Sequence, residues 1–272
     1  MGEFLSVMGP ALAASLLLAA VFVYFGLHIV RRGVIFVDLA LAQVAAMGGT
    51  VAFLLGYPLD GQGAYFFSLA FAFFGAVVFT LVRSREEAVP QEAMIGIVYA
   101  FAAAATVLLV DKAPHGAEHI KYLLVGNILW VTWSTIAQLF AVILVVALFH
   151  FLFRRNFFLV SFDSEQARRE GVSVALWDLL FYLSLAWVVT TSVQTAGVLL
   201  IFSFLIVPAV CGLLLSNRLR IGLLLGWLVG SAVSLAAIAL SYGWDLPTGA
   251  AIVCTFGITL LLIAVLKRFI VG

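Results

Sequence analysis

The chain has few charged residues. Only 10% of its 272 residues are Asp, Glu, Lys or Arg, whereas 65% are hydrophobic. A soluble domain carries roughly 25% charged residues, because its surface must face water. The mean hydropathy of +1.23 therefore indicates that lipid is the solvent for most of the chain. The net charge of +1 gives no reason to expect a nucleic-acid partner.

A disulfide framework and a nucleotide-binding loop are also missing. The two cysteines, Cys211 and Cys254, lie inside apolar runs and are interpreted as small apolar residues. The sequence contains no Gly-x-x-x-x-Gly-Lys-Ser/Thr, the loop whose backbone binds nucleotide phosphates. The chain therefore shows no phosphate-binding loop of this type.

Long apolar runs make up most of the sequence. A bilayer core needs about 20 apolar residues per helix, and nine segments reach or approach that length. The sixth and seventh segments meet at Ala196 and Gly197, so eight spans are the alternative to nine. We predict an all-α polytopic membrane bundle that forms a single domain over residues 1–272. The nine segments are residues 9–30, 34–56, 63–83, 92–111, 133–153, 176–195, 197–216, 221–242 and 248–267.

The basic residues favour nine spans and one orientation. With the N-terminus outside, 12 of the 14 Lys and Arg residues fall on the cytoplasmic side, and only Lys112 and Lys121 fall outside. Cytoplasmic loops of membrane proteins carry such an excess of positive charge. Merging the sixth and seventh segments would separate Arg218 and Arg220 from part of this group. We therefore predict an N-out, C-in arrangement.

One long polar segment, residues 154–172, interrupts the apolar runs. It holds seven charged residues and is cytoplasmic in the predicted orientation. Asp163 followed three residues later by Gln166 is a capping-box pattern, which predicts a helix over residues 164–170. Gly171 is placed to end that helix. A helix of this kind either lies on lipid headgroups or binds a soluble partner.

Four stretches of the sequence resemble the zinc/manganese/iron permeases of ABC transporters. FDSEQARREGV resembles the cytoplasmic coupling segment of that family, and RRGVIFVDLALAQVAAMGGTVAFLLG resembles its second span. GVLLIFSFLIVPA resembles its leucine-rich span with an internal proline, and LPTGAAIV resembles the start of its last span. The resemblance implies a permease subunit in a bacterial cytoplasmic membrane, which moves divalent metal ions and is not itself an enzyme.

The same resemblance implies partners. A separate ABC ATPase would bind ATP and dock on residues 161–171, two permease copies would pair, and an extracytoplasmic protein would deliver the metal. No covalently bound cofactor is expected. The alternatives are a permease for a metal chelate or another small solute, and a stand-alone channel or carrier. The residues expected to contact the ATPase are Phe162, Asp163, Glu165, Ala167, Arg168 and Gly171.

Asp38 is the clearest candidate ligand inside the membrane. It lies about one turn into the second segment, where an ionisable side chain is costly and therefore a functional candidate. In the resembled family an Asp followed by a His in this span supplies metal ligands, but here Ala42 and Gln43 follow Asp38 by four and five residues. A carboxylate with the Gln43 amide suits a harder ion than zinc. The alternative is that Asp38 pairs with Arg31 or Arg32.

A second candidate site lies in the predicted outer loop, residues 111–132. If DKAPHGAEHIK becomes helical after Pro114, then His115, Glu118 and His119 share one face. Imidazole and carboxylate groups are suitable ligands for a divalent transition metal. A solvated loop without a site is the alternative. The apolar end of this segment is too short to span the membrane, and we expect it to dip back into the bilayer.

Four further polar or helix-breaking residues lie within the spans. Gln194 is expected to line the transport path near the outer end of the sixth span. Pro208 is expected to kink the seventh span and free a backbone carbonyl, although a kink that only shapes packing is the alternative. His28 and His150 are expected to be satisfied side chains near the membrane surface rather than ligands.

Overall fold

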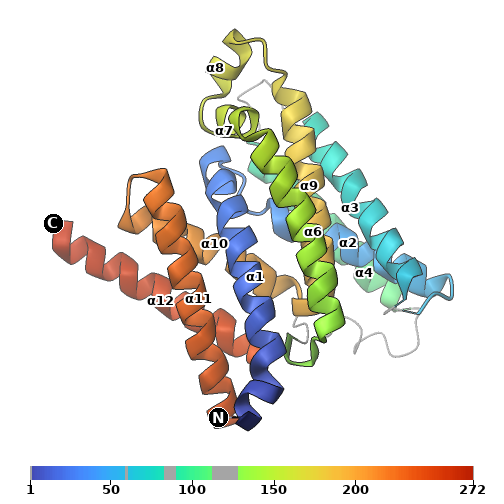
Figure 1. Cartoon of the computed structure of the whole chain (residues 1–272). Helices are drawn as coiled ribbons and strands as arrows, with labels where there is room; N and C mark the ends of the chain where they lie inside the picture. The colour runs from blue at the N-terminus through green and yellow to red at the C-terminus, as the bar shows by residue number, and fades with distance from the viewer. Residues whose placement is uncertain (1, 59–60, 83–89, 112–127, 272) are drawn as a thin grey trace. The chain divides into compact units, whose positions relative to one another are not determined.

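The computed structural model describes residues 2–58, 61–82, 90–111 and 128–271, and over these residues the regular structure is helical (Figure 1). The elements are α1 (Gly2–Arg32), α2 (Val37–Leu54), α3 (Gln62–Val82), α4 (Gln91–Val110), η1 (Ile128–Trp130), α6 (Trp133–Leu152), α7 (Arg154–Phe162), α8 (Ser164–Arg169), α9 (Val174–Ala196), α10 (Val198–Leu215), α11 (Leu219–Trp244) and α12 (Thr248–Val271).

Nine helices of the described part of the chain are long and apolar enough to cross a membrane. They are α1 to α4, α6 and α9 to α12, and each coincides with one predicted segment to within a few residues. Gly197 separates α9 from α10 with a φ of +81°, a conformation that L side chains rarely adopt. The all-α, nine-span prediction is therefore confirmed, and the eight-span alternative is not what the chain forms.

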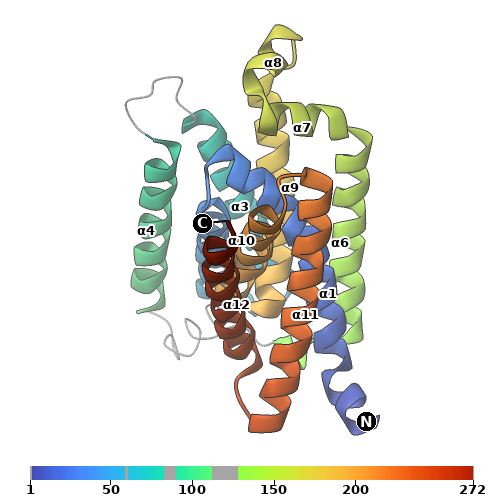
Figure 2. The same cartoon turned by 90° about the vertical axis from the view of Figure 1, so that its left-hand side faces the viewer.

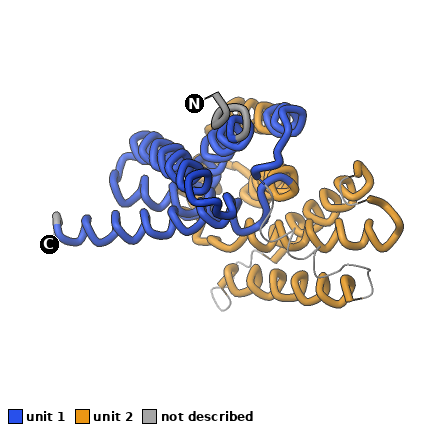
Figure 3. Tube along the Cα trace, turned by 90° about the horizontal axis from the view of Figure 1, so that it is seen from below, with its two compact units in different colours: residues 1–30, 125–141, 195–272 blue, residues 31–124, 142–194 orange. Residues whose placement is uncertain are grey.

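The described chain forms two compact units, which Figure 3 colours separately. Unit 1 comprises residues 1–30, 125–141 and 195–272, and unit 2 comprises residues 31–124 and 142–194. In unit 1, α10 packs on α11 and α12. In unit 2, α2 packs on α3 and α4, and α7 packs on α8.

Small residues bring the helices of unit 1 close together. Gly222, Gly226 and Gly230 recur every four residues on α11 and therefore share one face. A Cβ added at Gly226 would lie 2.7 Å from the carbonyl oxygen of Pro208 in α10, and one added at Gly212 would overlap the carbonyl oxygen of Gly222. Close backbone approach at small residues is a common way for membrane helices to associate, because dispersion contacts replace the hydrophobic effect in lipid.

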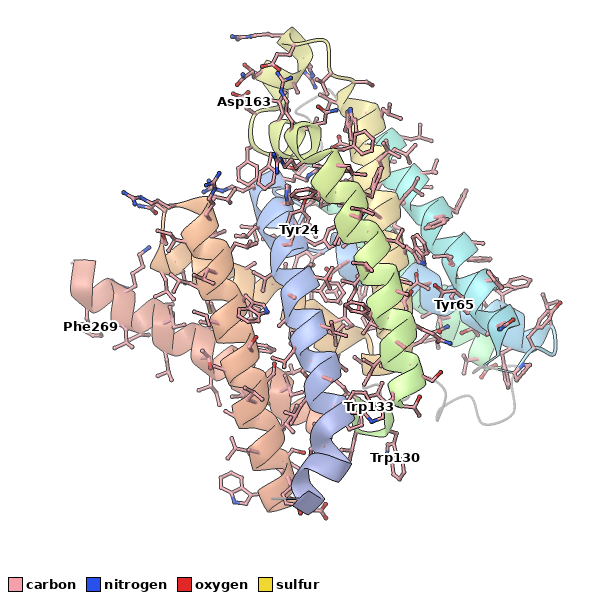
Figure 4. All side chains as sticks on the ribbon, in the orientation of Figure 1. Tyr24, Tyr65, Trp130, Trp133, Asp163 and Phe269 are labelled. Atoms are coloured by element: carbon pink, nitrogen blue, oxygen red, sulfur yellow. The ribbon has the colours of Figure 1, made fainter. Side chains whose placement is uncertain are left out.

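Large apolar side chains cover the outside of the span helices. Phe101 of α4 is 68% exposed and Leu261 of α12 is 68% exposed. Such a surface suits lipid and would be costly in water. Trp130 ends η1 and Trp133 begins α6 (Figure 4), and both are exposed, as tryptophans at membrane interfaces commonly are.

Candidate functional site

Asp38 is buried in the first turn of α2, with 1% of its surface exposed. Gly33 follows the end of α1 with a φ of +69°, and the chain then enters the first turn of α2. No side chain caps α2, and the positive end of the helix dipole favours a carboxylate in its first turn. The Oδ1 atom of Asp38 nevertheless has no hydrogen-bond partner among the described residues. Asp38 is thus a buried carboxylate with one oxygen that no described group satisfies.

Glu92 of α4 lies beside the start of α2. Its Oε1 atom accepts a hydrogen bond of 3.0 Å from the backbone N–H of Phe36, the residue that precedes α2 by one position. Its Oε2 atom is buried and has no hydrogen-bond partner within the described ranges. The Glu92 carboxylate is also close enough to Asp38 for the two to interact electrostatically. The first turns of α2 and α4 therefore bring two carboxylates together.

Gln43, the second predicted ligand of the span, is also buried, at 8% exposure. It lies on the same uninterrupted helix as Asp38, five residues further on. Five residues of α-helix correspond to a rotation of about 140° at 3.6 residues per turn. One copy of α2 therefore does not present Asp38 and Gln43 on a common face.

Arg32 contacts Asp178 rather than Asp38, so the pairing considered as an alternative for Asp38 is not formed. Its Nη1 donates to Oδ1 of Asp178 at 2.5 Å, and its Nε donates to Oγ of Ser161 at 2.9 Å. The guanidinium carbon lies 3.9 Å from the centroid of the Phe181 ring. The Arg32 and Asp178 side chains are 3% and 0% exposed. The last turn of α1 is thus tied to α7 and α9 by a buried ion pair.

The polar segment at residues 154–172 forms two helices, α7 and α8. The predicted α8 is present: Oδ1 of Asp163 accepts from the backbone N–H of Gln166 at 2.9 Å, and Gly171 follows the helix with a φ of +75°. The Gln166 side chain donates to Glu170 at 2.7 Å instead of returning to Asp163, so the capping box is half formed. Helix α7 was not predicted from the sequence. Figure 4 shows Asp163 where the two helices meet.

Aromatic and aliphatic packing fixes α7 and α8. Phe157 is fully buried and stacks on the His150 ring with centroids 3.9 Å apart, while Nε2 of His150 and Oγ of Ser184 are 2.8 Å apart. His150 is therefore the satisfied side chain that we predicted. Ala167 is buried in a small cluster with Val160 and Val174. These contacts give the segment a defined conformation.

The outer surface of this segment is amphipathic. In both views, α7 and α8 lie beyond the ends of α6 and α9 (Figures 1 and 2). Phe162 is 38% exposed and stacks on Phe158, while Arg155 forms an exposed ion pair of 2.9 Å with Glu170. A shallow hollow of about 480 Å³ opens between the two helices. Its lining consists of Arg155, Phe158, Leu159, Phe162, Asp163, Gln166 and Glu170.

The remaining predicted residues have different outcomes. Gln194 lies near the end of α9 and is partly buried. Pro208 is buried inside α10 and packs on Gly226 and Gly230 of α11. His115, Glu118 and His119 lie outside the described residues. Within the described ranges, no group of three or more His, Cys, Asp and Glu residues is arranged to hold a metal ion.

A sequence profile of the ABC 3 transport family matches residues 5–268. The chain belongs to this family. The resemblance found in the sequence is therefore confirmed: the protein is a transport permease of the ABC type and a multi-pass protein of a bacterial inner membrane.

Relatives within the ABC 3 transport family cover almost the whole chain. The manganese transport system membrane protein MntC of Halalkalibacterium halodurans is 28% identical over 255 residues, which is 91% of this chain and 83% of the relative. The chelated iron transport system membrane protein YfeC of Yersinia pestis is 26% identical over 246 residues, covering 90% and 81%. The solved structure of PsaBC from Streptococcus pneumoniae in complex with a Fab has the same fold, with a TM-score of 0.80 at 23% identity over 96% of this chain and 94% of that one.

Three features of the site region in this ABC 3 family member were not predicted from the sequence: Glu92, Asp178 and helix α7. Glu92 and Asp178 each lie within the first five residues of an apolar helix. Asp38 was predicted as a candidate because it is an ionisable residue in the first turns of an apolar helix. The same criterion applied to every apolar segment would have identified all three carboxylates. Helix α7 has no capping residue at its start, since Phe153 stands at the N-cap position and makes no side-chain cap bond.

Proposed function

We propose that this chain is the membrane-spanning permease subunit of an ATP-driven importer for a divalent metal ion, manganese or iron. Family membership supports the transport role, and the names of the manganese and iron relatives support the cargo. The missing histidine after Asp38 favours these ions over zinc, because carboxylate and amide oxygens suit harder ions. The permease itself breaks no covalent bond.

The observation that carries the proposal is the buried carboxylate of Asp38. It is 1% exposed inside an apolar helix, and its Oδ1 atom has no hydrogen-bond partner in the described part of the chain. An ionisable group at membrane depth is rare and usually marks an ion or substrate pathway. We propose Asp38 as the metal ligand of the transport path, with Gln43 as an auxiliary ligand and Gln194 and Pro208 as pathway or hinge residues.

The segment formed by α7 and α8 is the proposed contact with the ATPase. The chain has no nucleotide-binding loop, so a partner must hydrolyse ATP. Residues 161–171 combine an exposed Phe162, exposed charges and a buried Ala167, which gives a firm helix with an amphipathic outer surface. ATP-driven closure of the partner would move this segment. The Arg32 to Asp178 ion pair and the stacked Phe157 would carry that motion to α1, α6 and α9.

Two copies of the permease and an extracytoplasmic binding protein complete the proposed assembly. With the N-terminus outside, the ATPase segment is cytoplasmic and the loop of His115, Glu118 and His119 faces the binding protein. This loop is the proposed receiving site for the metal, since it offers imidazole and carboxylate ligands together.

The test is uptake of radioactive manganese by cells that lack their own manganese importers and express the chain with its ATPase. We expect uptake that needs a competent ATPase, and we expect Asp38→Asn to abolish it at unchanged membrane abundance. Asp245→Asn is the matched control, since Asp245 is a carboxylate that lies in the left-handed region at the end of α11, which Asn tolerates.

The alternative functions predict different results in the same system. A stand-alone channel or carrier would transport metal in liposomes that contain this chain alone, and that result would contradict the proposal. The relative from Yersinia pestis is named for chelated iron, which keeps a metal chelate as a second candidate cargo. Uptake of a chelate, but not of free Mn²⁺ or Fe²⁺, would select that cargo.

A further inference from the structure

Two buried carboxylate oxygens without partners lie at the start of α2. They are Oδ1 of Asp38 and Oε2 of Glu92, and neither has a hydrogen-bond donor among the residues that the structure describes. Buried polar atoms in folded proteins are almost always paired. Two unpaired acceptors from neighbouring helices therefore indicate that something else satisfies them.

A hydrogen bond holds the Glu92 side chain at the start of α2, where Asp38 also lies. The Phe36 N–H binds the other Glu92 oxygen, Oε1, at 3.0 Å, which anchors Glu92 two residues before Asp38. The two carboxylates interact electrostatically, and α2 packs along α4. A cation bound between two such carboxylates would supply the partner that both oxygens lack and would offset the repulsion between the two charges.

The two arginines that end α1, a few residues before Asp38, do not supply that cation. Arg32 binds Asp178 and Ser161, and its guanidinium stacks on Phe181. Arg31 lies over the Phe162 ring, with its guanidinium carbon 5.8 Å from the ring centroid. The guanidinium groups at the end of α1 are thus directed to α7 and α9.

We propose that Asp38 and Glu92 together bind a hard divalent cation, with Mn²⁺ as the best fit. The inference rests on the proposed transport function and adds Glu92 to it as the second ligand, in the place that the missing histidine leaves open. Two carboxylates match the charge of a divalent ion, and carboxylate oxygens are the ligands that Mn²⁺ accepts readily. Because the ligands come from two helices, relative movement of α2 and α4 opens or closes the site.

The experiment is a Mn²⁺ titration of the complete permease and ATPase complex in nanodiscs, followed by electron paramagnetic resonance of unbound Mn²⁺. We compare the wild type with Asp38→Asn, Glu92→Gln and the double variant. Glu92→Gln keeps a side-chain oxygen for the Phe36 N–H, so it removes the charge and preserves the start of α2. We expect each single change to raise the Kd by about 10-fold or more, and the double variant to be little worse than either.

Two further variants control the measurement. Asp245→Asn removes one negative charge at an exposed position of unit 1 and is expected to bind Mn²⁺ as the wild type does. Glu92→Asp keeps the charge on a shorter side chain and is expected to bind with intermediate affinity. Co-purification of the ATPase with each variant shows that it is folded, and if Glu92→Gln is not recovered, Glu92→Asp carries the test.

The outcomes separate this inference from the proposed function. If the wild type imports Mn²⁺ and needs Asp38, but Glu92→Gln binds Mn²⁺ with unchanged affinity, the two-carboxylate site is overturned and the transport function stands. If the wild-type complex imports Mn²⁺ but shows no saturable binding that depends on Asp38 and Glu92, the pair shares a proton and the inference is likewise overturned. If the wild type imports no Mn²⁺ with ATP present, the proposed function fails whatever the titration shows.

Discussion

Arg32 and Asp178 form a fully desolvated ion pair, with Nη1 2.5 Å from Oδ1 and side chains that are 3% and 0% exposed. The pair joins the last turn of α1 to α9, and the Arg32 Nε bond to Ser161 adds α7. Helix α7 is the first part of the proposed ATPase segment, and α9 follows that segment in the chain. The pair therefore adds a buried polar link between that segment and the ends of α1 and α9.

Removing one partner of this pair is expected to be far more damaging than removing both. Arg32→Gln leaves the buried Asp178 carboxylate uncompensated and should lower stability by about 3–5 kcal/mol. Asp178→Asn should have a similar effect, whereas the double variant should recover part of the loss. The measurement is the temperature at which the detergent-purified protein loses its monodisperse elution peak.

Arg155→Gln is the control for the ion-pair prediction. Arg155 pairs with Glu170 at 2.9 Å, but its side chain is 82% exposed. Exposed pairs contribute about 0–1 kcal/mol, so little change is expected. If Arg32→Gln also melted like the wild type, the buried pair would have no structural role.

The cap of α8 gives a prediction about the ATPase. Asp163→Ala removes the acceptor of the Gln166 N–H bond, which stabilises a helix by about 1 kcal/mol. Unfolding of α8 should reduce co-purification of the ATPase. Because α8 has six residues and is mostly exposed, the melting temperature of the permease should change little.

Asp163→Ser separates the cap from the charge at this position. Serine caps a helix about as well as aspartate but is neutral. Normal co-purification of Asp163→Ser would show that the ATPase recognises the shape of α8, and loss in both variants would show that it recognises the carboxylate. Full retention in Asp163→Ala would contradict the proposed docking site.

The sequence predicted those parts of the protein that depend on local patterns. The lengths of the apolar runs predicted nine helices. The capping residue Asp163 and the terminating Gly171 predicted α8 to within one residue of its observed ends. The sequence could not predict that Arg32 binds Asp178 across 146 positions of chain, because only the packing of the helices brings the two side chains together. Asp38 and Gln43 were predicted as joint ligands because they are close in sequence. The packing of α2 on α4 instead brings Glu92 to the start of α2, where it interacts electrostatically with Asp38.

The outer-loop histidines are predicted to act at metal delivery. We expect His115→Ala combined with His119→Ala to raise the KM for manganese uptake and leave the maximal rate unchanged, since a receiving site matters only when the metal is scarce. Asp38→Asn should instead abolish uptake at every manganese concentration. Uptake measured over a range of manganese concentrations distinguishes the two sites, and an unchanged KM in the double histidine variant would remove the loop from the mechanism.

The last prediction concerns the glycines of α11 that let it pack closely on α10 in unit 1. A Cβ at Gly226 would lie 2.7 Å from the Pro208 carbonyl oxygen and 2.9 Å from Cγ1 of Val23. Gly226→Ala therefore forces α11 away from α10 and should lower stability by about 1–3 kcal/mol, although alanine is the better helix former. Gly257→Ala in α12 is the matched control, since a Cβ there meets nothing within 4 Å. We expect the control to melt at or above the wild-type temperature, and a higher melting temperature for Gly226→Ala would show that the helices yield without strain.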